Sequence, residues 1–135
     1  MSLVLFVDDP AFAVKVEPVG TASIYGQPDE TAMASGAGAM TSRTDGLGYW
    51  LATTEGLVVA FGQAEHYGDM RGTSLNQPIV GMVATSTNQG YWLVASDGGI
   101  FSFGDALFYG STGALTLNSP IVGMAASQSG NGYWL

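Results

Sequence analysis

The sequence predicts an all-β chain of the propeller type, about three four-stranded blades with a period of 42 residues. The first observation is the tripeptide Gly-Tyr-Trp, which occurs at residues 48–50, 90–92 and 132–134, each 42 residues after the last. A constant, gapless period is the mark of a repeat architecture. The second is the 20 glycines and 5 prolines, which favour short strands and turns over long helices. The third is that each repeat holds about four short apolar segments, as a propeller blade does.

The copies predict a single repeat domain over residues 1–135, a length typical of one domain. Residues 48–89 and 90–131 align without a gap and share 18 identities, a diverged copy covers 3–47, and 132–135 begin a further copy. One repeat cannot bury its own apolar face, so the copies must pack on one another. A β-trefoil, which also uses three copies of this length, is the alternative architecture.

The copy that begins at Gly90 shows where the strands of a blade are expected. Residues 91–96 are aromatic and β-branched and predict a strand. Asp97-Gly98-Gly99 has the composition of a hairpin turn, and residues 100–103 form the returning strand. After Gly104-Asp105, residues 106–110 predict a third, shorter strand.

The innermost strand of this blade is expected at residues 121–126, a continuous apolar run of the kind that is buried on both faces. Gly123 in its middle suggests that a neighbouring backbone approaches closely. Equivalent segments lie near residues 37–42 and 79–84.

Composition narrows the classes of partner. Hydrophobic residues make up 47% of the chain and charged residues 10%, which is a folding composition. The net charge is −8, with Lys15, Arg43 and Arg71 as the only basic residues. Binding to nucleic acid or to an anionic membrane needs clustered basic residues, so neither partner is expected. Without cysteine, disulfides and thiolate metal sites are excluded.

The stretch GYWLVASDGGIFSFGDA from Gly90, followed by FYGS at 108–111 and by LN and PIVGMAA within 117–126, resembles a tandem repeat of many secreted actinobacterial proteins. There it often accompanies cell-wall hydrolase or peptidase domains. The resemblance is specific over 90–135, good over 48–89 and poor over 1–35. It implies a propeller-like module outside the cytoplasm, secreted or at the cell envelope, and brings no catalytic residues.

The second copy departs from this pattern at its acidic turns. Glu55-Gly56-Leu57 replaces Asp97-Gly98-Gly99, and Gln63 replaces Asp105. A role assigned to those aspartates is therefore not shared by every blade.

The recurring aromatic pairs are the candidate ligand-binding residues. They are Tyr49, Trp50, Tyr91, Trp92, Tyr133 and Trp134. The favoured interpretation is packing between blades, because alternation along a strand puts one ring of each pair in the core. In the alternative, the other ring is exposed and stacks on the faces of sugars.

Acidic residues supply weaker candidates. Asp97, Asp105 and Glu55 precede or follow glycine in turns, where an aspartate is normally satisfied by its own backbone. Calcium coordination is the alternative, but no Asp-x-Asp-x-Asp spacing occurs, so no metal and no cofactor are predicted. Asp8-Asp9 is interpreted as a solvated loop.

Catalysis has one candidate set, Glu65, His66 and Asp69, which contains the only histidine. A general base needs an orienting partner and a substrate pocket, and the sequence reveals neither. We therefore expect no enzyme activity, and a propeller-based hydrolase is the third of three functional hypotheses.

The phase of the repeats suggests an open ring. Residues 3–26 follow no innermost strand, whereas residues 121–135 begin a blade, so the two ends complement each other. We expect head-to-tail self-association, with a dimer of about six blades, because propellers have 4–8. The alternative is that the chain is part of a longer propeller. The predicted function is a non-catalytic module that binds a glycan or a protein at the cell envelope, and a purely structural interaction scaffold is the first alternative.

Overall fold

The computed structural model describes residues 2–6 and 14–135, and every regular element of this part is a β-strand. The all-β prediction is thereby confirmed. Asp8-Asp9 lies outside the described residues. No helix in the described part is long and apolar enough to cross a membrane. The strands are β1 (Ser2–Phe6), β2 (Lys15–Val19), β3 (Ala37–Ser42), β4 (Gly48–Thr53), β5 (Val58–Gly62), β6 (Ile79–Ala84), β7 (Gly90–Ala95), β8 (Ile100–Gly104), β9 (Ala125–Ala126) and β10 (Tyr133–Trp134).

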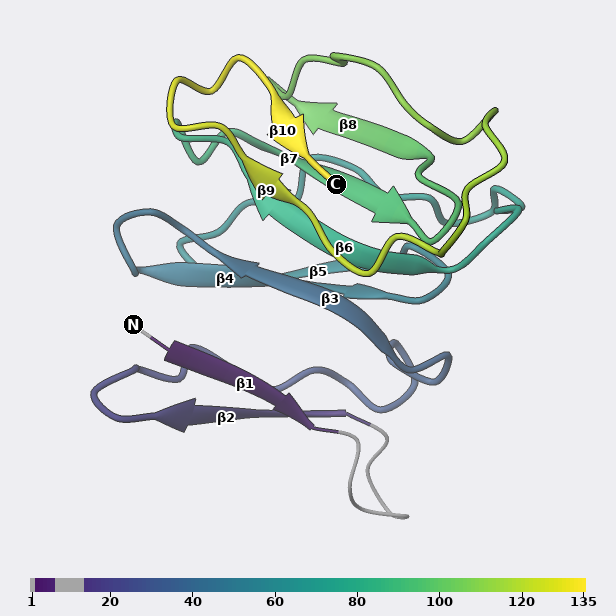
Figure 1. Ribbon diagram of the computed structural model, residues 1–135. Coiled ribbons are helices and arrows are strands. Elements are labelled where there is room, and N and C mark those ends of the chain that lie inside the picture. The colour runs from purple at the N-terminus through teal and green to yellow at the C-terminus, as the bar shows by residue number, and fades with distance from the viewer. Residues whose placement is uncertain (1, 7–13) are drawn as a thin grey trace.

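The strands form four antiparallel sheets that follow one another along the chain. Their strand orders are β1-β2, β3-β4-β5, β6-β7-β8 and β10-β9. Figure 1 shows the sheets lying face to face in sequence order, with the N-terminal hairpin at one end of the stack and β9-β10 at the other. Each sheet therefore contacts the sheets that precede and follow it.

The two three-stranded sheets repeat the same register. Gly48 pairs with Gly62 where β4 meets β5, and Gly90 pairs with Gly104 where β7 meets β8. Both sheets also have an irregularity near the start of the first strand, in β3 and in β6. The 42-residue period of the sequence is thus a period of backbone structure.

The expected outer strand at residues 106–110 does not form, and the full sheets have three strands rather than four. Gly104, with φ of +66°, turns the chain out of the sheet. The N–H of Tyr109 then donates to the hydroxyl of Tyr133 in the next sheet, at 3.1 Å. The segment leaves its own sheet because its hydrogen-bonding partner lies in the following one.

The innermost strand expected at residues 121–126 is also shorter than predicted. Only Ala125–Ala126 pairs as a strand, and the segment is partly exposed. Burial on both faces belongs instead to the central strands β4 and β7, in which every residue is buried. They lie between two flanking strands and between two neighbouring sheets, so no face is left for solvent.

Three apolar cores lie between successive sheets. Side chains alternate along a strand, so each central strand contributes to two cores. Tyr49 and Leu51 of β4 face the N-terminal hairpin, whereas Trp50 faces the β6-β7-β8 sheet. Trp92 of β7 faces the C-terminal sheet. The stack is therefore stabilised mainly by burial between repeats, as repeat proteins are.

Small residues let the first strands of neighbouring sheets approach closely. A Cβ added to Gly38 would lie 2.5 Å from the carbonyl oxygen of Ile79, and one added to Gly81 would lie 3.2 Å from the Cα of Gly123. The close approach predicted at Gly123 is thus confirmed for its contact with Gly81. A Cβ on Gly123 itself would meet nothing within 4 Å, so its outward side is open.

Candidate functional site

The three motif tyrosines form a hydrogen-bonded ladder that joins each sheet to the preceding repeat. The hydroxyl of Tyr91 donates to the carbonyl of Gly68 at 2.5 Å and accepts from the N–H of Tyr67 at 3.2 Å. The same pair of bonds recurs at Tyr49 and at Tyr133. The repeated tyrosine is therefore a connector between copies.

The tryptophans of the first two motifs are equally structural. The indole N–H of Trp50 donates to the carbonyl of Glu65, and that of Trp92 to the carbonyl of Leu107, each at 2.7 Å. Trp50 also packs on Tyr91 of the next sheet, with ring centroids 5.7 Å apart. Tilted aromatic contacts of this kind add to the stabilisation from area burial.

Of the six candidate aromatic residues, the structure buries four. The exposed fraction is 0% for Tyr49, Trp50 and Tyr91 and 2% for Trp92, so both rings of each pair are in a core. A sugar cannot stack on a ring that has no accessible face. Trp134 differs, because 63% of it is exposed.

We expect the tyrosine ladder to weaken in alkali, because burial raises the pKa of Tyr91 to about 12. A raised pKa means that folding favours the neutral phenol. Its contribution to stability is complete below the usual tyrosine pKa of about 10 and is lost as the pH rises toward 12. The free energy of unfolding, measured in urea between pH 9 and 12, should fall over this range. Tyr91→Phe should show a smaller fall, and an equal fall would contradict this role.

The predicted turn acids have different partners. Asp97 behaves as expected, since its carboxylate accepts from the N–H of Gly99 at 2.9 Å. Asp105 instead accepts from the hydroxyls of Thr85 and Thr87, at 2.8 and 2.5 Å, and so ties β8 to the turn before β7. Glu55 lies at the hairpin end of a cleft described below. In the described part of the chain, no three His, Asp or Glu side chains gather as a metal site would require.

A functional position that sequence reasoning missed is Asn88. It has a φ of +60°, where the equivalent residues Gly46 and Gly130 also have positive φ. Its amide exchanges two hydrogen bonds of 2.8 Å with Thr44 in the turn of the preceding sheet. The 42-residue alignment held the signal, because a non-glycine stands there in a glycine position.

The catalytic candidates come together only in part. His66 Nε2 lies 3.2 Å from Asp69 Oδ2, whereas the Glu65 carboxylate accepts from the hydroxyl of Tyr67 at 3.3 Å. Burial raises the pKa of Asp69, but hydrogen bonds from the N–H of Arg71 and from His66 outweigh it, so the pKa lies below its usual value. Asp69 is thus held as a carboxylate that fixes its own loop.

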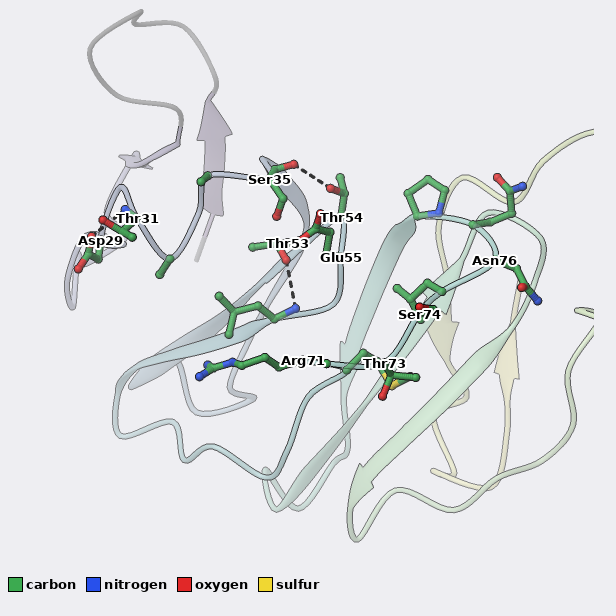
Figure 2. A pocket seen from close by; sticks show the side chains of 18 residues that line it. Asp29, Thr31, Ser35, Thr53, Thr54, Glu55, Arg71, Thr73, Ser74 and Asn76 are labelled. Carbon is green, nitrogen blue, oxygen red and sulfur yellow. Dashed lines mark hydrogen bonds between the residues drawn. The ribbon is translucent and has the colours of Figure 1, made fainter.

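A cleft of about 950 Å³ lies beside the β4-β5 hairpin and offers the best-formed recess for a ligand. Residues from 29–35 and 70–78, two connectors one repeat apart, form its walls, and residues from 53–57 complete it. Figure 2 shows Asp29 and Thr31 on one side and Ser74 and Asn76 on the other. The cleft is therefore built from equivalent parts of successive repeats.

The walls of this cleft are anchored to the ends of strands. The N–H of Thr54 donates to the carbonyl of Gly36, and the carbonyl of Thr54 accepts from the N–H of Ile79. The Thr54 hydroxyl donates to the carbonyl of Ser35 at 2.8 Å, a bond drawn in Figure 2. Fixed walls lower the entropy lost when a ligand binds.

The cleft has the chemistry of a hydrogen-bonding site. Hydroxyl and amide side chains dominate its lining, with Asp29, Glu55 and Arg71 as its charged groups. Arg71 is 72% exposed at the side chain and keeps its guanidinium 3.6 Å from Asp69. None of the lining residues is aromatic. Such a lining suits a polar ligand held by several directional hydrogen bonds.

A second hollow of about 950 Å³ lies near the opposite ends of the same sheets. Arg43 lines it, but its guanidinium is already bound to Asp45 at 2.6 and 3.0 Å and to the carbonyl of Gln63. These contacts leave the cleft beside the β4-β5 hairpin as the better candidate. Comparison with protein-family models finds no matching family, and comparison with curated proteins finds no matching protein.

Proposed function

We propose that this chain is a non-catalytic, propeller-like repeat module that binds an extended protein segment in the cleft between residues 29–35 and 70–78. The observation that carries the proposal is the position of the cleft. It lies between two equivalent connectors, its walls are held by backbone hydrogen bonds, and none of the motif aromatics lines it. Binding in it is therefore independent of the contacts that stabilise the stack.

The lining favours a polypeptide over a glycan. Sugar recognition by stacking needs an exposed ring, whereas the cleft offers hydroxyls and amides such as Thr54, Ser74 and Asn76. An extended peptide presents alternating N–H and C=O groups that match such side chains. The net charge of −8 favours a neutral or basic segment, because the field of the module attracts cations.

A propeller-like arrangement is supported by the four sheets that lie face to face in sequence order, with small residues where their first strands meet. The resemblance to secreted repeats supports a location at the cell envelope. In this setting the segment bound is part of a protein of the envelope, and the module positions its own polypeptide there.

The test uses an immobilised library of neutral and basic peptides, with soluble peptidoglycan fragments in parallel. We expect peptides to bind, and the double variant Arg71→Ala/Asn76→Ala to lower affinity at least about tenfold through lost hydrogen bonds. The matched control is Asn118→Ala, an exposed asparagine 42 residues after Asn76 that does not line the cleft. Binding of peptidoglycan alone would replace the protein ligand with a glycan, and binding of neither would overturn the proposal.

A further inference from the structure

We propose that two copies of this chain associate head to tail by strand donation, in which residues 121–126 of one copy extend the β1-β2 sheet of the other and pack on its β3. The inference deepens the propeller-like arrangement proposed above and names its partner as a second copy. It does not depend on ligand binding in the cleft.

The donor segment has free backbone and free side chains. In the preceding repeat, β6 pairs with β7 from Ile79 to Ala84. In the last repeat only β9 is paired, and residues 121–124 have no ladder partner in the described structure. Val122 is 85% exposed, whereas Val80, its equivalent, packs against a core between sheets. The segment has the sequence of an inner strand without the contacts of one.

The face of the last sheet is open in the same way. Trp50 and Trp92 are buried, and each packs on a tyrosine of the following sheet at 5.7 Å. Trp134, at the same position of the motif, is 63% exposed. The repeating interface thus indicates what should cover this face, namely another sheet of the same kind.

The acceptor is the N-terminal end of the stack. The β1-β2 sheet matches the second and third strands of a full sheet, because β2 lies 42–43 residues before β5. Within the described residues, no strand pairs with β1 on the side where β3 flanks β4. Every residue of β3 is also half-exposed, whereas four of the six residues of β6 are buried. β6 lies between two first strands, and β3 lacks the neighbour on one side.

The register of the joint follows from the repeat. Gly81 pairs with Val94 and Ile79 with Ala95 in the full sheet. The positions equivalent to Val94 and Ala95 are Leu5 and Phe6, because Leu5 pairs with Val16 as Val94 pairs with Ile100. Strand donation therefore places Gly123 opposite Leu5 and Ile121 opposite Phe6 of the second copy.

Ser2 and Leu3 would lie where β10 already pairs with β9, so these two residues leave the ladder. Little hydrogen bonding is lost there, because Leu3 lies opposite Pro18, which has no N–H to donate. With two copies, each end meets the complementary end of its partner. The result is a closed ring of about six sheets, within the range of propellers.

Light scattering after gel filtration at micromolar concentration tests the association. We expect twice the mass of one chain, and a monomer for Val122→Asp, which would put a charge into the joint. Phe108→Asp is the matched control, because Phe108 is 61% exposed outside the proposed joint and the variant should remain a dimer. A monomeric mass for the unchanged protein would overturn the proposal.

A cross-linking experiment tests the register. The chain has no cysteine, so Ile121→Cys and Phe6→Cys can be made as separate proteins and mixed under oxidising conditions. Residues opposite each other in a ladder are close enough for a disulfide. The mixture should yield a covalent dimer that neither protein forms alone, and its absence would contradict this register. Peptide binding by the monomeric Val122→Asp protein separates the two proposals, since its cleft lies within one chain.

Discussion

Trp50→Ala is expected to lower the free energy of unfolding by about 3–5 kcal/mol, the range for removing a large buried aromatic side chain. Trp50 has no exposed surface, packs on Tyr91 and donates to the carbonyl of Glu65. The variant loses the buried area, leaves a cavity between two sheets and leaves that carbonyl without its partner. Urea unfolding followed by circular dichroism measures the effect.

The control for this variant is Phe108→Ala, which removes a large ring that is 61% exposed. We expect a change within about 0.5 kcal/mol, because surface substitutions away from special contacts have small effects. Equal losses for Trp50 and Phe108 would show that the core between the sheets does not govern stability.

The second large effect is expected at the first residue of the motif. Gly90→Ala would place a Cβ closer to the carbonyl oxygen of Phe103 than van der Waals contact allows, and 2.7 Å from the N–H nitrogen of Asp105. The obstacle is backbone, which cannot move without opening the pair between Gly90 and Gly104. We expect a loss of about 3 kcal/mol, at the upper end of overpacking effects.

Gly132→Ala is the matched control for the motif glycine. Around Gly132 an added Cβ would meet only the Ser127 hydroxyl, at 3.9 Å. The same substitution should therefore be tolerated within about 0.5 kcal/mol, as measured by urea unfolding. A large loss at Gly132 would mean that the conformational preference of glycine, rather than the close approach, explains the motif.

Local features of the sequence predicted local features of the structure. The aromatic run after Gly90 is a strand, and Asp97-Gly98-Gly99 is a turn whose Asp97 bonds its own backbone. The inner segment at 79–84 is the strand beside it. Strand propensity and turn chemistry act over a few residues, so one sequence suffices to read them.

Features that depend on contacts between repeats were predicted less well. The segment at 106–110 has strand composition, but Tyr109 finds its hydrogen-bonding partner in the next sheet. Asp105 bonds two threonine hydroxyls rather than its own turn. The cleft was not predicted, because hydroxyls and amides dominate its connectors and no motif marks it.

By itself, the sequence determined that this protein is a chain of all-β repeats with a period of 42 residues, because identical residues at a constant step require equivalent backbone positions. Tertiary structure alone decided the roles of the motif residues: Gly90 admits a neighbouring backbone, Tyr91 joins two repeats, and Trp92 fills the next core. The reason is that alternation puts Tyr and Trp on opposite faces of a strand, and only the stacking of sheets shows that both faces are covered.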